Sequence, residues 1–110
     1  MKRPERLRFL GKQMTVRYVP AGDALLRDGT DDASPGVGRS DGGKQSMAIE
    51  DGQPLASEQD TVLHETLHII EEYMGMDVPE EVVAKFATGL LAVIKDNPRF
   101  VSYLRQKEPK

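Results

Sequence analysis

The spacing of hydrophobic residues predicts strands in the first half of the chain and helices in the second. In residues 11–19, the side chains of Met14, Val16 and Tyr18 alternate with the neighbouring positions, and this period of two is typical of a β-strand. Residues 45–49 form a second mainly apolar run and are expected to be another strand. We therefore expect a small antiparallel sheet of two to three strands.

The segment between these strands, residues 21–43, is rich in Asp, Gly and Ser and is expected to be a long loop. Within it, residues 37–40 are a candidate short strand, and Asp41-Gly42-Gly43 is typical of a hairpin turn. The aspartates of residues 28–32 resemble a solvated turn, because their spacing does not fit a calcium-binding EF-hand loop.

From residue 57 onward the hydrophobic period becomes helical. Ser57 is a predicted N-cap, with Asp60 in the position of a capping-box partner. We expect this first helix to run to about Met74, because Gly75 is well suited to end it.

A second helix is predicted to begin at an Asp77 cap, with Pro79 in its first turn, and to continue to about Lys95. Pro98 ends it, and residues 98–106 are expected to add a short helix. The order of strands first and helices afterwards predicts an α+β fold in which the sheet packs on two main helices. The residues expected to form the buried stripe of the second helix are Val82, Val83, Phe86, Leu90, Val93 and Ile94.

The length of 110 residues predicts one domain over residues 1–110, with flexible ends at 1–11 and 107–110. A net charge of -3 argues against nucleic acid or an anionic membrane surface as a partner. The lack of cysteine excludes disulfides and thiolate metal sites, and it suits the cytoplasm. We find no apolar stretch of membrane-spanning length and no signal-peptide core, so a cytoplasmic protein is expected.

Candidate chemistry is concentrated in the pentad His64-Glu65-Thr66-Leu67-His68, which contains both histidines of the chain. Residues four apart on a helix share a face, so both imidazoles can reach one metal ion. Glu65 lies on the same polar strip and is placed to act on water at that metal, which is the arrangement of zinc peptidases. The alternative is an ordinary pair of surface histidines.

A catalytic zinc ion needs a third protein ligand, and with no further His or Cys it must be a carboxylate. Glu71 would approach along the axis of the same helix, at a poor angle, whereas a carboxylate of the next helix can approach from the side. A helical wheel places Glu80 at the edge of the apolar arc and Glu81 toward the polar side, so Glu80 is favoured, although it also fits a role in capping. The other candidates are Glu81, Glu71, Glu72 and Asp77.

Two stretches resemble a known family. Residues 62–70, with the pentad, and residues 79–91, with the sequence PEEVVAKFATGLL, resemble the ImmA/IrrE-like zinc peptidases, and more closely their small phage- and prophage-encoded relatives. These relatives carry a strand hairpin, an H-E-x-x-H helix and an E-E-x-V-x-x-L/F-A-x-G-L helix. They often end in D-N-P, matched here by residues 96–98.

The resemblance implies a minimal zincin-like fold with the pentad on its first helix, and zinc as the cofactor. In the larger family, the third zinc ligand is a glutamate six residues before a Phe-Ala step, a position that Glu80 occupies here. Two departures from the family pattern are visible. Ala84 replaces an asparagine of the family, and the connection between the pentad and the second helix is short.

The expected function is zinc-dependent hydrolysis of peptide bonds, with His64, His68 and Glu80 as zinc ligands and Glu65 as general base. The same ligands also suit manganese or iron. The alternative is a catalytically weak or inactive zinc-binding regulatory module of phage or prophage origin. A polypeptide substrate or a regulatory protein partner is expected, in the host bacterial cytoplasm if the protein is phage-encoded.

Two further features complete the expected site. Tyr73 and Tyr103 are candidate donors to an oxyanion, although each also suits an ordinary core or surface position. The strand at residues 45–49 is expected to offer its edge to an extended substrate.

Overall fold

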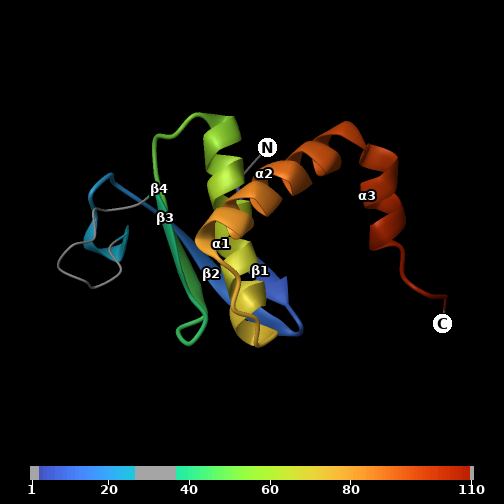
Figure 1. Cartoon of the computed structure of the whole chain (residues 1–110), viewed down its shortest axis with the longest axis horizontal. Coiled ribbons are helices and arrows are strands. Elements are labelled where there is room, and N and C mark those ends of the chain that lie inside the picture. Colours follow the sequence, from blue (N-terminus) through green and yellow to red (C-terminus); the bar gives the residue numbers. More distant parts are fainter. Residues whose placement is uncertain (1–2, 27–36, 110) are drawn as a thin grey trace.

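The computed structural model describes residues 3–26 and 37–109 and has the expected α+β fold (Figure 1). A four-stranded sheet is followed by three α-helices, none of which, in the described part of the chain, is long and apolar enough to cross a membrane. The elements are β1 (Arg6–Phe9), β2 (Lys12–Val19), the 3-10 turn η1 (Ala24–Leu26), β3 (Gly38–Asp41), β4 (Ser46–Glu50), α1 (Leu55–Tyr73), α2 (Glu80–Asp96) and α3 (Pro98–Arg105).

The sheet is larger than predicted and is mixed rather than antiparallel. Its strand order is β1-β2-β4-β3, with antiparallel pairs at both sides and a parallel pair, β2 and β4, in the centre. Parallel neighbours require a long crossover connection. Here that connection contains η1 and β3, so residues 21–43 are not a loop throughout. The predicted turn at residues 28–32 lies outside the described residues.

The N-terminal segment is also more ordered than expected, because Arg6–Phe9 form β1 and pair with β2. The side chain of Leu7 packs against the core, while its basic neighbours are exposed. The expectation of a flexible end at residues 1–11 is therefore wrong for Arg6–Phe9, whose alternation of basic and apolar side chains is the pattern of a half-buried edge strand.

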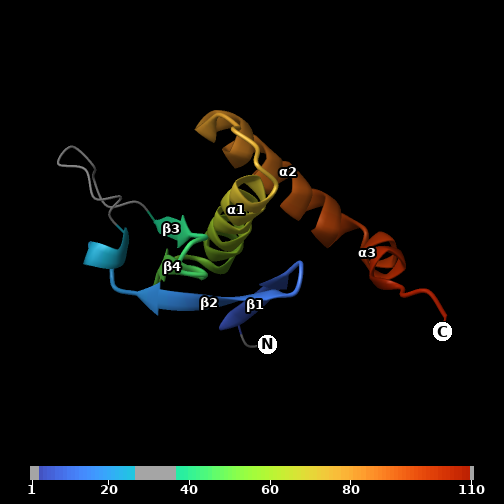
Figure 2. The same ribbon diagram turned by 90° about the horizontal axis from the view of Figure 1, so that it is seen from below.

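Helix α1 covers one face of the sheet, and α2 packs on the side of α1 away from the sheet (Figure 2). The core lies between the sheet and α1. It is formed by residues with almost no exposed surface, namely Met14, Val16, Met47, Ile49 and Ile69.

Both main helices begin at different residues from those predicted. Pro54 and Pro79 are the residues that precede α1 and α2, and no side chain caps either helix, so the predicted caps Ser57 and Asp77 are wrong. Proline suits this position because it has no backbone N–H that the helix would leave unpaired, and the Pro54 carbonyl accepts a hydrogen bond from Glu58 N at 2.9 Å. At the other end of α1, Gly75 has the expected left-handed backbone (φ 67°).

The predicted buried stripe of α2 is largely wrong. Of its six residues, Val83 is buried, and it is joined in the core by Ala87, whereas Phe86, Leu90, Val93 and Ile94 are exposed. The reason is that α2 runs past α1, so α1 covers only the first half of α2 (Figure 1). An apolar helix face therefore continues beyond the helix that should bury it.

Candidate metal centre

Three side chains from α1 and α2 converge on one point. His64 Nε2 lies 2.5 Å from Glu80 Oε1, and His68 Nε2 lies 2.7 Å from Glu80 Oε2. The two Nε2 atoms are 3.2 Å apart. Among the described residues, the ligand atoms of these three side chains lie close enough together to hold one metal ion.

Local structure explains this convergence. The histidines are four residues apart on α1 and therefore point the same way. Gly75 ends α1, and the short link that follows brings the start of α2 back to the polar strip of α1. Glu80 is the first residue of α2, so its side chain reaches both imidazoles from the side.

The donor set of these groups, and the spacing of its two nitrogens, fit a divalent metal. Two ligand atoms that are each about 2.0–2.1 Å from a tetrahedral metal lie about 3.3 Å apart, and the two Nε2 atoms of His64 and His68 are separated by 3.2 Å. Both oxygens of Glu80 approach these nitrogens within hydrogen-bond distance. Two imidazoles and one carboxylate are a donor set that zinc and several other transition metals accept.

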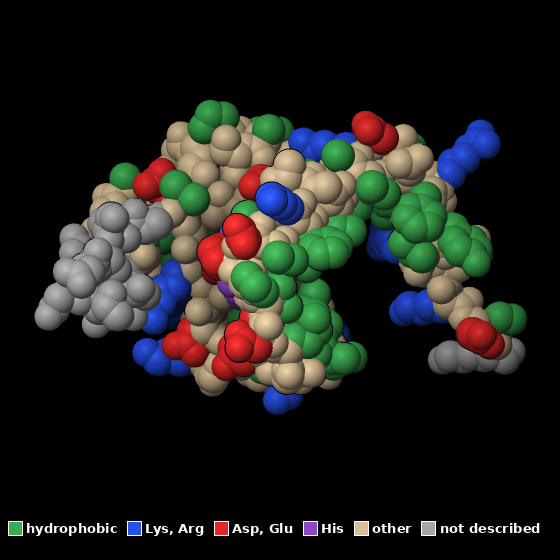
Figure 3. All heavy atoms as spheres, in the orientation of Figure 1, with side chains coloured by type: hydrophobic (Ala, Val, Ile, Leu, Met, Phe, Trp, Pro, Cys, Tyr) green, Lys and Arg blue, Asp and Glu red, His purple; other side chains and the backbone are tan. Residues whose placement is uncertain are grey.

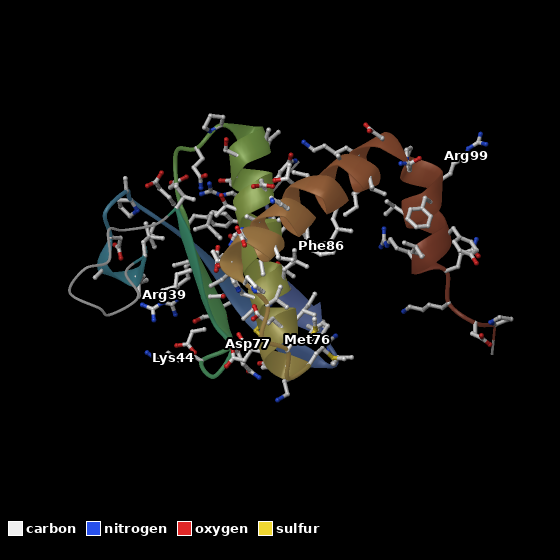
Figure 4. All side chains as sticks on the ribbon, in the orientation of Figure 1. Arg39, Lys44, Met76, Asp77, Phe86 and Arg99 are labelled. Carbon is white, nitrogen blue, oxygen red and sulfur yellow. The ribbon has the colours of Figure 1, made fainter. Side chains whose placement is uncertain are left out.

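The other candidate carboxylates have different positions. Glu72 accepts a hydrogen bond from Gly42 N at 3.0 Å. Glu81 and Asp77 are exposed and lie outside the three-residue group; Asp77 belongs to the link before α2 (Figure 4). The structure thus brings Glu80, rather than Glu81, Glu72 or Asp77, to the histidines.

Glu71 contacts His68 on its other nitrogen. Glu71 Oε1 lies 3.0 Å from His68 Nδ1, and its second oxygen accepts a hydrogen bond from Val78 N at 2.7 Å. A proton on Nδ1 leaves Nε2 of His68 with its lone pair directed at Glu80 and the metal position. One carboxylate therefore orients His68 and also fixes the link that leads to Glu80.

The acidic surroundings act on the pKa of His68. Burial alone would lower this pKa, but the hydrogen bond to Glu71 and the charges of Glu80 and Glu65 outweigh burial, so the pKa of His68 is raised. Acidic side chains gather around the histidines on the surface where α1 and α2 meet (Figure 3). The site therefore favours positive charge, as a cation-binding site should.

Glu65 lies beneath β3 and is only 6% exposed. Burial raises the pKa of its carboxyl, while a hydrogen bond from the Ser40 hydroxyl opposes that shift. A Cβ atom added at Gly38 would lie 3.1 Å from Glu65 Cγ. The absence of a side chain at Gly38 therefore allows β3 to approach Glu65 closely.

A cleft of about 570 Å³ opens beside these groups, between β3 and the two helices. Glu65, His68 and Glu80 line it together with Gly38, Arg39, Ser40, Glu71, Glu72 and Met76. The strand next to the cleft is β3, which lies at the edge of the sheet, whereas β4 pairs on both sides. The expectation that residues 45–49 offer a free edge is therefore wrong.

Neither predicted oxyanion donor is placed for that role. The Tyr73 hydroxyl donates to the Gly42 carbonyl at 2.9 Å, and its ring stacks on Phe9 with the ring centres 6.0 Å apart. Tyr103 is on α3, which projects away from the cleft (Figures 1 and 2). Tyr73 therefore has a structural role and Tyr103 is a surface residue, as the alternative interpretation of each had it.

Sequence reasoning missed the role of β3 in the site. Gly38 and Ser40 in β3, and Gly42 directly after it, alternate with larger side chains and face α1, where they meet Glu65 or Glu72. Small residues at every second position of a strand are a signal for close approach to another element. That signal was available in the sequence.

No protein-family model, curated protein sequence or solved structure matches the chain. The function is therefore inferred from the geometry of the site itself.

Proposed function

We propose that this protein is a zinc-dependent metallopeptidase with a minimal zincin-like fold. The observation that carries the proposal is the pairing of Glu80 with both histidines of the H-E-x-x-H pentad, at the wall of a cleft that Glu65 also lines. The resemblance of residues 62–70 and 79–91 to the ImmA/IrrE-like peptidases supports the same conclusion.

His64, His68 and Glu80 would hold the zinc ion. When bound, zinc acts as a Lewis acid and lowers the pKa of a water molecule toward neutrality. His68 is held by Glu71 in the tautomer that leaves Nε2 free to coordinate. His64 and His68 have 17% and 25% of their side-chain surface exposed, so the protein shields both nitrogens while the cleft remains open.

Glu65 would accept a proton from the attacking water and later deliver it to the amine that leaves. Its raised pKa supports this role, because a carboxyl that holds a proton more tightly is a better base near neutral pH. The Ser40 hydroxyl holds this carboxylate in one orientation. Proton transfer thus depends on the contact between α1 and β3.

The edge of β3 would bind the backbone of an extended polypeptide. Val37 O accepts a hydrogen bond from Glu50 N, so residues 37, 39 and 41 turn their backbone groups toward β4. The backbone groups of Gly38 and Ser40 therefore point to the outer edge, beside the cleft. A substrate strand added there would pass the metal position, which supports a polypeptide as substrate.

One observation favours a second candidate function. The three ligands come from two helices, so a bound metal would also tie α2 to α1. In this alternative the protein is a catalytically weak or inactive zinc-binding module of phage or prophage origin that regulates another protein.

The two functions differ in their dependence on Glu65. We would measure zinc content and hydrolysis of an unfolded, fluorescently labelled protein for the wild type, Glu65→Gln and the neighbouring control Glu81→Gln. If the protein is a peptidase, Glu65→Gln should retain zinc but lose hydrolysis, while Glu81→Gln should retain both. Zinc binding without hydrolysis in the wild type, on this substrate and on candidate regulators, would favour the interaction module.

A further inference from the structure

The C-terminal helix α3 leaves its apolar side chains uncovered. It has eight residues, none of them buried, and packs mainly on α2. Phe100, Tyr103 and Leu104 are spaced at i, i+3 and i+4 and are all exposed, while Arg99 and Arg105 belong to its polar side. An isolated helix of this length has only marginal stability in water, so we expect these side chains to pack against a partner surface.

A complementary surface lies on α2 of the same chain. An apolar hollow of about 410 Å³ is lined by Lys85, Phe86, Gly89, Leu90 and Val93. A Cβ atom added at Gly89 would meet nothing within 4 Å, so the floor of the hollow is open. Phe86 lies on the side of α2 that faces the space between α1 and α3, which we call the arch (Figure 4).

The arch is open in the space-filling view, where hydrophobic side chains follow the underside of α2 toward α3 (Figure 3). The structure extends 50 Å along its longest axis, and its radius of gyration is 14.7 Å, against about 13 Å for a compact domain of this length. Within the described residues, the chain therefore does not fold α3 back onto its own hollow.

We propose that a second copy of this chain fills the arch, so that two copies exchange their α3 helices in a two-fold dimer. The α3 helix of each copy packs its apolar side into the α2 hollow of the other. This arrangement covers the apolar side of α3 and the hollow on α2 in both chains. Two copies satisfy each other completely, so no further copy can add to the dimer.

The exposed area is sufficient for a stable dimer. Seven exposed hydrophobic residues on α2 and α3 contribute, namely Phe86, Leu90, Val93, Ile94, Phe100, Tyr103 and Leu104. Their exposed fractions correspond to roughly 700 Å², given full side-chain areas of about 150–250 Å². Two copies would together bury roughly 1,400 Å², within the range of stable interfaces.

The charge distribution favours a second copy as the occupant. Residues 45–84 contain ten acidic residues and no Lys or Arg, whereas residues 85–110 contain six basic and two acidic residues, a net charge of +4. The acidic side chains of α1 contact β3, the link before α2, α2 itself or Arg3, so these opposite charges act at a distance rather than inside the arch. Attraction between the acidic segment of one copy and the basic segment of the other therefore favours the encounter of two copies.

The test is the mass of the full-length protein by light scattering over a concentration series, with three variants. Leu104→Glu damages the helix that is inserted, Gly89→Glu fills the hollow that receives it, and Ser102→Glu is the control on the polar side of α3. We expect the wild type and Ser102→Glu to reach twice the chain mass of 12.2 kDa, and each damaged variant to remain at the chain mass. Circular dichroism would verify that all variants are folded.

Mixing the two damaged variants tests the exchange itself. A mixed dimer retains one intact α3 in one intact hollow, so mass should shift back toward the dimer, whereas direct α3–α3 packing predicts no recovery. A monomeric wild type, an unchanged Leu104→Glu dimer, or a mixture that stays monomeric would each overturn the proposal. A wild type that is monomeric alone but binds an acidic amphipathic peptide would overturn it in favour of a different partner.

Discussion

The close approach of β3 to α1 at Gly38 can be tested by adding a single methyl group. In Gly38→Ala, the new Cβ would lie 2.6 Å from Thr61 Cγ2 and 3.1 Å from Glu65 Cγ. Thr61 cannot rotate away freely, because its hydroxyl donates to Ser57 O at 2.8 Å and lies 3.1 Å from Gln53 Oε1. Either β3 moves away from α1 or Thr61 loses these contacts.

The expected loss of stability follows from two opposing effects. Overpacking of this kind costs about 1–3 kcal/mol, while replacing glycine by alanine restricts the unfolded chain and returns about 0.4–1 kcal/mol. We therefore expect Gly38→Ala to lower the free energy of unfolding by about 1–2 kcal/mol, which corresponds to about 4–8 °C in melting temperature for a chain of this length. Hydrolysis should fall as well, because the close contact between β3 and Glu65 is disturbed.

Urea denaturation monitored by circular dichroism would measure this change, with Gly89→Ala as the matched control. Gly89 is inside α2 with open space around its Cβ position in the single chain, so Gly89→Ala should instead raise stability by about 0.5–1 kcal/mol when the protein is dilute enough to be monomeric. Adding Thr61→Ser to Gly38→Ala removes Cγ2 and keeps the hydroxyl, and should recover part of the loss. Equal stability of the two glycine variants would refute the proposed contact between β3 and α1.

Three further predictions concern the metal centre. Glu71→Gln should weaken zinc binding about 10–100-fold in a chelator competition, because it disturbs the group that orients His68. In excess chelator, Glu65→Gln should be more stable than the wild type at neutral pH but not below pH 4.5. The direction follows from the raised pKa of the Glu65 carboxyl. The wild type has its full free energy of unfolding while this carboxyl is protonated, and loses part of it as pH rises through that pKa. Finally, zinc at about 100 times its dissociation constant should add about 2.7 kcal/mol to the wild type and nothing to His64→Ala.

Each of these predictions has a contrary result. Unchanged zinc affinity in Glu71→Gln would mean that Glu71 serves only the link before α2. A stability difference between Glu65→Gln and the wild type that does not change with pH would contradict ionisation of a buried carboxyl. An equal effect of zinc on His64→Ala would place the bound metal elsewhere in the chain.

Local patterns predicted much of the fold. The period of two in residues 11–19 and the helical period from residue 57 are properties of single elements, and the structure has β2 and α1 there. The strand order was not predictable in the same way, because the pairing of β2 with β4 depends on a crossover through residues 21–43. The weak signal of β1 was hidden by its two arginines.

The candidate site was likewise predictable from the sequence only in part. His64 and His68 follow from helix periodicity alone, and the helical wheel and the family resemblance both favour Glu80. The role of β3 required knowledge of which strand lies at the sheet edge, and the exposure of Phe86 required knowledge of where α1 stops covering α2. Both depend on how elements pack, which no pattern within one element reveals.

We propose that His64, His68 and Glu80 together hold one divalent metal ion. The most direct test is zinc content by plasma mass spectrometry, together with chelator-competition affinity, for the wild type, His64→Ala, Glu80→Gln and the control Glu81→Gln. We predict about one zinc per chain in the wild type and Glu81→Gln, none in His64→Ala, and strongly weakened binding in Glu80→Gln. Equal zinc binding in Glu80→Gln and the wild type, or none in the wild type after zinc is added, would contradict the claim.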